Sequence, residues 1–270
     1  MSASAESRPG DRDRGTYDDP AIVAAYAREV DLQPAEIAIR DSLPDLATLD
    51  MIDLGVGAGR TARHFAPRVR SYVGIDYAPG MVERCRRDLP GHRFEVGDAC
   101  RLDGLADASS DFVLFSYNGI DHVGLDERAL VLREMARLLR PGGTLAFSSH
   151  NANFLPRIIE RFRPRLPIGE GLRPVARAVR DTLYFHWHNP TLRWRMPIAK
   201  GVVNDGLHNF RSSGICYIRP DLQVAQLAEK GLQDIRCLRH DVPAFIAGTD
   251  PSVRTLPNPW VYYACRKPAS

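Results

Sequence analysis

A glycine-rich turn between an apolar run and a helical pattern is the feature that most constrains this fold. In the stretch IDLGVGAGRTA (residues 52–62), three glycines alternate with other residues: Gly55, Gly57 and Gly59. Glycine lacks a Cβ, so the backbone can turn tightly there and approach a bound ligand closely. The motif alone is weak evidence, because GAGRTA also satisfies the GxGxxA pattern of dinucleotide-binding turns.

The chain around this turn alternates short apolar strands with amphipathic helices. Such alternation predicts right-handed βαβ units and a mostly parallel sheet. The last two strands have no helix between them, so we expect them to pair antiparallel at the sheet edge. We therefore expect an α/β fold with a seven-stranded, mostly parallel sheet and an antiparallel edge strand. The expected strands are residues 49–55, 71–76, 92–99, 110–119, 144–150, 233–241 and 260–268.

Residues 151–218 do not follow this alternation of strands and helices. Between residues 151 and 220 there are eleven arginines and one lysine against four acids, a net charge of +8 in a chain whose total is +3. We expect this insertion to form a lid that recognises substrate over the strand ends, within a single domain of residues 16–270. Residues 1–15 are polar and charged, and we expect them to be disordered.

Composition excludes several classes of protein. With 44% hydrophobic and 26% charged residues, the 270-residue chain has ordinary globular usage. No run of about 18 apolar residues is present, so we expect no membrane-spanning helix. The five cysteines form no CxxC pair, and the first fifteen residues lack a secretory apolar region. We therefore expect a cytoplasmic protein with reduced thiols.

Three acids lie at or near the ends of the first three strands: Asp53, Asp76 and Asp98. Open α/β sheets bind ligands at the carboxyl ends of their strands. Asp76, about 20 residues after the turn, is placed to accept hydrogen bonds from two ribose hydroxyls. Asp98 is placed to accept one from an adenine amino group. Asp53 either holds its own turn by hydrogen bonds or contacts a ligand, and the sequence leaves both open.

Five motifs together resemble the class I S-adenosylmethionine-dependent methyltransferases, which have a Rossmann-like fold. They are IDLGVGAGRTA, VGIDYAPGMV, FEVGDA, FVLFSYNGIDHV and LLRPGGTLAFSS, in this order. The resemblance covers about residues 17–150 and resumes at about residue 220. It implies S-adenosyl-L-methionine as the cofactor. The acids at the strand ends suit that cationic sulfonium better than a pyrophosphate, which needs a helix N-terminus.

The resemblance also implies which residues bind this cofactor. The three glycines would pass beneath its methionine and ribose parts, and Asp76 would bind the ribose. Tyr77 and Met81 would flank the adenine, whose edge would meet Asp98 and Ala99. A tyrosine of the N-terminal segment would close over the cofactor. This tyrosine would be Tyr17 or Tyr26. The residues near the sulfonium and the acceptor would be Ser116, Tyr117 and Asn118.

Candidate acceptor and catalytic residues follow the fourth and fifth strands. His122 and His150 are each either structural or a contact or base for the acceptor, and Asn118 belongs to the same catalytic set. Asp121 is either a solvated turn acid or an acceptor contact. In the insertion, the candidates for binding an anionic acceptor are Trp187, Arg193, Arg195 and Arg211. We expect no metal in the reaction.

The sequence therefore predicts transfer of a methyl group from S-adenosylmethionine to oxygen or nitrogen of a small, anionic molecule. We expect a monomer or homodimer with no nucleic-acid or membrane partner. Three alternatives stay open: methylation of a peptide or RNA, an NAD-dependent oxidoreductase, and a non-catalytic nucleotide-binding protein.

Overall fold

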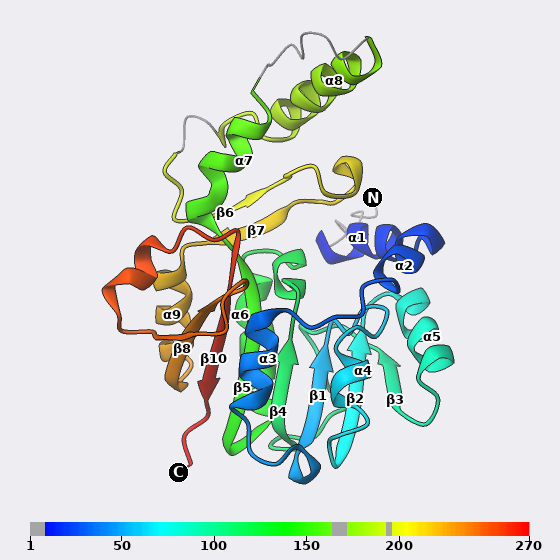
Figure 1. Cartoon of the computed structure of the whole chain (residues 1–270), viewed down its shortest axis with the longest axis vertical. Helices are drawn as coiled ribbons and strands as arrows, with labels where there is room; N and C mark the ends of the chain where they lie inside the picture. Colours follow the sequence, from blue (N-terminus) through cyan, green and yellow to red (C-terminus); the bar gives the residue numbers. More distant parts are fainter. Residues whose placement is uncertain (1–8, 164–171, 193–195, 270) are drawn as a thin grey trace, which may run out of the picture.

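The computed structural model describes residues 9–163, 172–192 and 196–269. Its strands form one sheet (Figure 1). They are β1 (Asp50–Leu54), β2 (Ser71–Asp76), β3 (Arg93–Val96), β4 (Ser110–Phe115), β5 (Leu139–Asn151), β6 (Lys200–Val203), β7 (Ile215–Ile218), β8 (Gln233–Arg239), β9 (Phe245–Ala247) and β10 (Trp260–Arg266). The helices are α1 (Pro9–Tyr17), α2 (Pro20–Tyr26), α3 (Pro34–Asp41), α4 (Ala62–Phe65), α5 (Pro79–Asp88), α6 (Glu127–Leu138), α7 (Leu155–Arg161), α8 (Leu172–His188) and α9 (Pro220–Glu229).

The strand order confirms the predicted α/β class. The order is β3-β2-β1-β4-β5-β10-β8-β9, and the pairs from β3 to β5 are all parallel. The two closing strands, β8 and β10, pair antiparallel as expected. The antiparallel strand β10 lies inside the sheet, between β5 and β8, because β8 and the short β9 extend the sheet beyond it. The strands β6 and β7 of the insertion and β9 add to the seven expected.

The sheet lies between two hydrophobic layers, and successive side chains along a strand point alternately into one layer and the other. In β1, Ile52 and Leu54 pack with α6 and α9, whereas Met51 packs on the opposite face with α3, α4 and α5. In β4, Val113 and Phe115 face the first layer, and Phe112 and Leu114 face the second. This period-two burial is what a strand covered by helices on both faces requires.

Two strands, β4 and β3, end at least three residues earlier than the sequence predicted. After Phe115 the backbone enters the left-handed region at Tyr117 (φ 55°) and Asn118 (φ 63°), so β4 ends and a turn leads to the short helix η2 (Gly119–His122). The strand β3 ends at Val96, leaving Gly97 and Asp98 in the following turn. Both early ends leave residues outside the strand pairing at the carboxyl ends of the strands, where ligands bind in this class of fold.

The N-terminal segment begins its ordered structure earlier than expected. Disorder was expected up to residue 15, but α1 begins at Pro9; residues 1–8 lie outside the described part of the chain. Buried Tyr17 and Val23 pack with Met81 of α5, so α1 and α2 are anchored on the body of the domain. This contact explains the difference, because it buries apolar side chains that a disordered segment would leave in water.

The insertion has a hydrophobic core of its own. Phe162 stacks on Phe185 of α8, with ring centroids 4.3 Å apart, and both pack with Leu155, Val203 and Ile215. Parallel pairing of β7 with the end of β5 attaches this unit to the sheet. Figure 1 shows α7, α8 and the β6–β7 hairpin projecting beyond the strand ends, with the hairpin tip next to α1.

Candidate functional site

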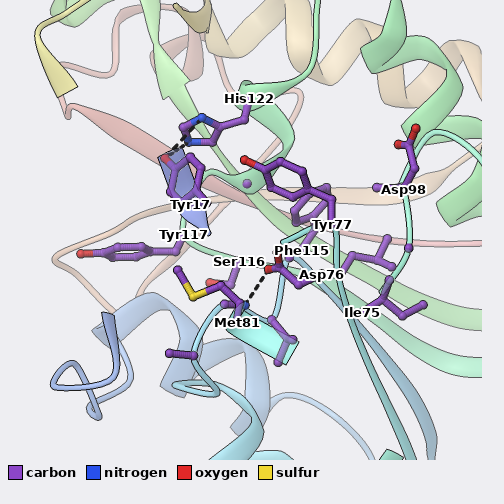
Figure 2. Close-up of a pocket in the computed structure, with 18 of the residues that line it drawn as sticks. Tyr17, Ile75, Asp76, Tyr77, Met81, Asp98, Phe115, Ser116, Tyr117 and His122 are labelled. Atoms are coloured by element: carbon purple, nitrogen blue, oxygen red, sulfur yellow. Dashed lines mark hydrogen bonds between the residues drawn. The ribbon is translucent and has the colours of Figure 1, made fainter. Parts of the chain in front are cut away.

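A cavity of about 390 Å³, drawn in Figure 2, is lined by residues at the carboxyl ends of the parallel strands and by Tyr17 of α1 and Tyr26 of α2. Its volume falls within the range of about 300–1,000 Å³ that small-molecule sites occupy. Residues from several elements far apart in sequence line it. The predicted site residues that line it are Tyr17, Tyr26, Gly55, Gly57, Asp76, Tyr77, Met81, Asp98, Ala99, Ser116, Tyr117 and His122.

The glycine turn forms the floor of this cavity. Gly55 has φ 59°, and a Cβ there would come within 2.4 Å of the Phe115 ring. Gly57 has φ 55°, and a Cβ there would meet only Tyr26, at 4.0 Å. A side chain at residue 57 would therefore fill the cavity itself. Gly59 does not line the cavity; a Cβ on it would press against Cys85 at 3.3 Å, so its role is close packing between the turn and α5.

Asp76, the last residue of β2, is buried beside the turn. Its Oδ2 accepts a hydrogen bond from the Gly57 N–H at 2.8 Å, and its Oδ1 accepts one from the Ala78 N–H at 2.9 Å. Burial raises the pKa of Asp76, and these two hydrogen bonds oppose the rise. Each carboxylate oxygen keeps a second lone-pair site, so the side chain can accept two more hydrogen bonds from a ligand.

Tyr77, Met81 and Asp98 line the part of the cavity next to β3. The Tyr77 ring packs edge-on against Tyr17, with centroids 6.0 Å apart, and its buried hydroxyl has no hydrogen-bond partner among the described residues. Met81 is buried in the first turns of α5. The Asp98 carboxylate accepts a hydrogen bond from the Cys100 N–H at 2.8 Å, which holds the turn after β3. This end therefore combines flat apolar surfaces with an acid.

His122 and Tyr17 meet at the other end of the cavity. The Tyr17 hydroxyl lies 3.1 Å from His122 Nε2, and the rings pack edge to face (Figure 2). Burial and the nearby tyrosines raise the pKa of Tyr17, so its phenol stays protonated. Tyr117 stands beside them, where burial and Glu29 raise its pKa to about 12. This end presents an imidazole and two neutral phenols.

A buried ion pair that the sequence did not reveal supports the turn. Arg60 binds Glu36 of α3 through two hydrogen bonds of 2.6 Å. Although burial opposes the charge, the Arg60 guanidinium lowers the pKa of Glu36. Ser116 also donates to Glu36, and Tyr262 of β10 bonds the same carboxylate at 3.0 Å. The only local signal was the position of Arg60 directly after the glycines; Glu36 had none.

Asp53 does not line the cavity, and the structure decides between its two alternatives. Its Oδ2 accepts hydrogen bonds from Thr61 Oγ1 at 2.6 Å and from the Tyr72 hydroxyl at 2.8 Å. The side chain is 1% exposed, and burial raises its pKa to about 7. Asp53 therefore holds the turn to α4 and β2, rather than contacting a ligand.

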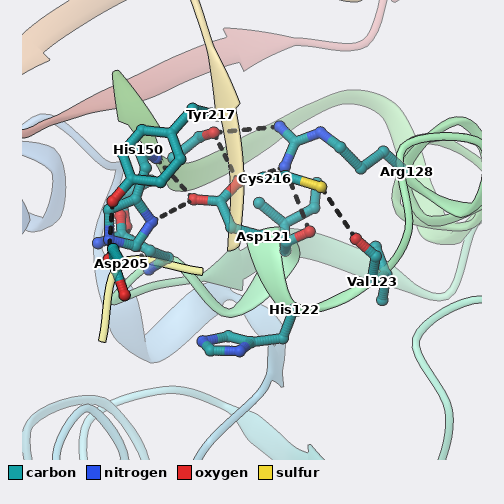
Figure 3. A network of polar contacts seen from close by, with 12 residues as sticks. Asp121, His122, Val123, Arg128, His150, Asp205, Cys216 and Tyr217 are labelled. Atoms are coloured by element: carbon teal, nitrogen blue, oxygen red, sulfur yellow. Dashed lines mark hydrogen bonds and ion pairs between the residues drawn. The ribbon is translucent and has the colours of Figure 1, made fainter. Parts of the chain in front are cut away.

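His150 and Asp121 also lie outside the cavity, which favours a structural role over the acceptor contact that the sequence left open for each. Asp121 is fully buried, pairs with Arg128 of α6 and accepts a hydrogen bond from His150 Nδ1 at 2.8 Å (Figure 3). Although burial opposes the charge, Arg128 and His150 lower the pKa of Asp121. The His150 ring packs against Tyr217 of the insertion, at 5.1 Å between centroids. This network joins η2, β5, α6 and β7.

The remaining predicted residues are dispersed. Asn118 is buried, and its backbone N–H donates to Ser148 Oγ at 2.8 Å, so it shapes the turn without lining the cavity. Trp187 is 83% exposed on α8. Arg211 pairs with Asp19 at 3.0 Å and lines a separate cavity of about 260 Å³. Arg193 and Arg195 lie outside the described residues.

The described residues contain no group of metal ligands and no membrane-spanning helix. Over residues 9–163, 172–192 and 196–269, no three histidine, cysteine or acidic side chains are grouped as metal ligands would be. None of the helices in these ranges has both the length and the apolar character to cross a membrane. Independence from metal remains a prediction.

Comparison with known proteins identifies the class. Residues 52–147 match a family model described as a methyltransferase domain. The chain belongs to the class I S-adenosylmethionine-dependent methyltransferases, enzymes whose cofactor is S-adenosyl-L-methionine. This confirms the resemblance seen in the motifs and sets aside the NAD-dependent and non-catalytic alternatives.

Among curated relatives, a malonyl-[acyl-carrier protein] O-methyltransferase of Serratia marcescens is 26% identical over 225 residues, covering 79% of this chain and 82% of that protein. A trans-aconitate 2-methyltransferase of Methylobacterium nodulans is 31% identical over 130 residues, covering 47% of this chain and only 48% of that protein. Among solved structures, an S-adenosylmethionine-dependent methyltransferase from Mesorhizobium loti superposes with TM-score 0.57 at 19% identity, covering 87% of this chain and 98% of that one. That likeness shows the fold.

Proposed function

We propose that this enzyme methylates an oxygen or nitrogen atom of a small, acid-bearing acceptor, with S-adenosylhomocysteine as the co-product. One observation carries the proposal: a single cavity joins Asp76 and Asp98 at the strand ends to Tyr17 and His122 beneath α1. The first pair suits a nucleoside, and the second pair suits an acceptor that donates or accepts a proton. Because both ends belong to one cavity, the two ligands can meet inside it.

The residues at the first end fit the cofactor. The open space beside Gly57 can take the methionine and ribose parts, since a Cβ there would project into the cavity. The free lone pairs of Asp76 would accept from the ribose hydroxyls. Tyr77 and Met81 would pack on the adenine, with Asp98 at its edge. The bound cofactor would supply a methyl group on a cationic sulfur; the chain positions it and excludes water.

At the second end, His122 is the proposed proton acceptor. His122 lines the cavity, and its Nε2 lies 3.1 Å from the Tyr17 hydroxyl. An acceptor hydroxyl or N–H that replaced this phenol would place its proton on the Nε2 lone pair. General-base catalysis of this kind contributes about 10²–10⁴-fold to a rate. Tyr117 would pack against the acceptor from the side.

A different arginine replaces those expected to bind the acidic group. Arg14 of α1 lines the cavity, whereas Arg211 is paired with Asp19 elsewhere. The Arg14 side chain is exposed and has no ion pair among the described residues. A guanidinium at the mouth of the cavity can bind a carboxylate through two parallel hydrogen bonds.

The names of the relatives favour a second candidate, methylation of the carboxylate itself. The two relatives above are named for trans-aconitate and for a malonyl group, both of which carry carboxylates. A carboxylate is already ionised near neutral pH and needs no base. In that case Arg14, Tyr17 and His122 would all donate hydrogen bonds to it, and no proton would be removed.

Methyl transfer to a panel of acceptors tests both candidates. The panel contains hydroxy acids, amino acids, phenols and dicarboxylates including trans-aconitate, with labelled S-adenosylmethionine as donor and S-adenosylhomocysteine measured. We expect turnover of an acid-bearing acceptor, weakened by Arg14→Gln. His122→Gln should abolish activity on hydroxyl acceptors and spare it on carboxylates, while His92→Gln, outside the cavity, should change neither. Turnover confined to peptide or RNA would overturn the proposal.

A further inference from the structure

His122 has a buried acid beside its Nδ1 atom. Asp13 of α1 is 0% exposed, and its Oδ2 lies 3.7 Å from His122 Nδ1. Such contacts are often long in the absence of substrate and tighten in the working complex. Asp13 falls in the stretch that the sequence predicted to be disordered, so nothing in the motifs pointed to it.

The insertion holds this carboxylate in place. The Ser213 N–H donates to Asp13 Oδ1 at 2.7 Å, and Ser212 Oγ lies 3.4 Å from Oδ2. These contacts join residues about 200 positions apart in the chain. The carboxylate therefore reaches His122 only when α1 is docked against the tip of the β6–β7 hairpin.

The Asp13 carboxylate indicates which tautomer of His122 is favoured. The Tyr17 hydroxyl lies 3.1 Å from Nε2 and 3.4 Å from Nδ1, and a protonated phenol can donate to or accept from either nitrogen. The carboxylate of Asp13 only accepts and lies beside Nδ1, so it favours the tautomer whose proton is on Nδ1. In that tautomer Nε2 presents its lone pair, to which the Tyr17 phenol can donate.

We propose that Asp13 is a positioning residue for methyl transfer: its buried carboxylate holds the Nδ1–H tautomer of His122, which leaves the Nε2 lone pair free to take a proton from the acceptor. This inference rests on the proposed function. The acceptor's O–H or N–H bond breaks, its proton goes to Nε2, and its electron pair forms the bond to the methyl carbon. The carbon–sulfur bond breaks with its pair on sulfur, and the resulting imidazolium is stabilised by Asp13 until water removes the proton.

Other ionisable groups around His122 leave this assignment intact. Tyr17 is neutral, and Asp76 of β2 interacts with His122 electrostatically from across the cavity. His208, in the short helix η5 (Leu207–Phe210) of the insertion, packs on the far side of Tyr17, with ring centroids 5.2 Å apart. Burial lowers the pKa of His208 and its electrostatic interaction with Asp13 opposes this, so the lowered pKa leaves His208 neutral near pH 7.

Nitrogen NMR of the full-length protein with isotope-labelled histidine tests the proposal without turnover. The two ring signals of His122, assigned by their loss in His122→Gln, report which nitrogen is protonated. The sample contains saturating S-adenosylhomocysteine, so failure of the proposed function would appear separately, as failure of this probe to bind. In the wild type we expect the Nδ1–H form; finding mainly the Nε2–H form would overturn the proposal without any variant.

Two matched variants separate positioning from simple docking of α1. Asp13→Asn should raise the Nε2–H population several-fold, and Asp13→Glu should partly restore the wild-type signals. Asp19→Asn removes a different contact between the N-terminal segment and the insertion, the ion pair of Asp19 (just before α2) with Arg211, without touching His122. We expect it to leave the signals unchanged. No change in Asp13→Asn, or an equal change in Asp19→Asn, would refute the positioning role.

Discussion

The sharpest prediction concerns the ribose contact of Asp76. Each oxygen of this carboxylate already accepts one backbone N–H, from Gly57 and Ala78, and keeps one lone-pair site for a ligand. Two ribose hydroxyls would fill those sites. The Asp76→Asn variant keeps one acceptor oxygen but loses the charge and one of the two oxygens, so at least one charge-assisted hydrogen bond is lost.

The expected magnitude follows from that loss. A hydrogen bond to a charged group contributes about 1.5–3 kcal/mol, which corresponds to roughly 10- to 150-fold in affinity. The amide also turns an N–H toward one of the two backbone donors, which disturbs the turn and weakens binding for a second reason. Substitution in the protein alone therefore cannot isolate the ribose contact, and a change in the ligand is needed as well.

Calorimetric titration of two ligands into two proteins completes the test. The ligands are S-adenosylhomocysteine and its analogue lacking both ribose hydroxyls; the proteins are wild type and Asp76→Asn. Removing the ribose hydroxyls from the ligand should weaken its binding free energy by about 1.5–3 kcal/mol more in the wild type than in the variant. Asp103→Asn, at an exposed acid outside the cavity, should behave as wild type. If both proteins lose the same affinity, Asp76 does not bind the ribose.

Three further predictions concern stability. Arg128→Met leaves the buried Asp121 carboxylate without its ion pair, and we expect a loss of about 3–5 kcal/mol in urea unfolding. Gly55→Ala places a methyl group 2.4 Å from the Phe115 ring at a positive φ, and should cost at least about 2 kcal/mol and weaken S-adenosylhomocysteine binding. Burial raises the pKa of Asp53 to about 7, whereas an unfolded Asp titrates near about 3.9; wild-type stability should therefore fall as pH rises between these values, and Asp53→Asn should lack that fall.

Matched variants check these three expectations. Arg133→Met changes an exposed arginine on the same helix, and Gly104→Ala adds a methyl group with no atom within 4 Å. Both should unfold as wild type. Equal losses in Arg128→Met and Arg133→Met would refute the role given to the buried pair. A wild-type stability that rises between pH 4 and 7 relative to Asp53→Asn would refute the burial argument.

The strand-end part of the cavity was predictable because its residues lie within local motifs. Asp76 ends β2 and Asp98 follows β3, and the parallel pairing of these strands brings their ends together, so both residues line the cavity. Asp53 shows the limit of that reasoning. It lies one residue before the end of β1, and alternation sends its side chain to the same face as Met51, beneath α4. Strand periodicity therefore explains why Asp53 does not point into the cavity.

The residues that the sequence did not reveal are paired over long separations. Glu36 meets Ser116 across 80 positions and Tyr262 across 226, and neither distance leaves a pattern in the chain. Asp121 and His150 were found from the sequence and lie at the predicted edge of the sheet. However, Asp121 binds His150 and Arg128, and neither Asp121 nor His150 faces the cavity. A polar residue at a strand end can be predicted; which of its neighbours it will bind cannot.

The insertion affects the site through α1 rather than directly. None of its described residues lines the main cavity, so the lid predicted to recognise substrate does not cover it by itself. Instead, Ser213 and Arg211 bind Asp13 and Asp19, on either side of the tyrosine that closes the cavity. A change in the insertion would then alter acceptor chemistry by moving α1, while leaving the strand-end carboxylates undisturbed. Under the proposed function, the acceptor contacts of α1 and the strand-end carboxylates belong to different parts of the chain, so acceptor preference can diverge among proteins that share this sheet without loss of the cofactor site.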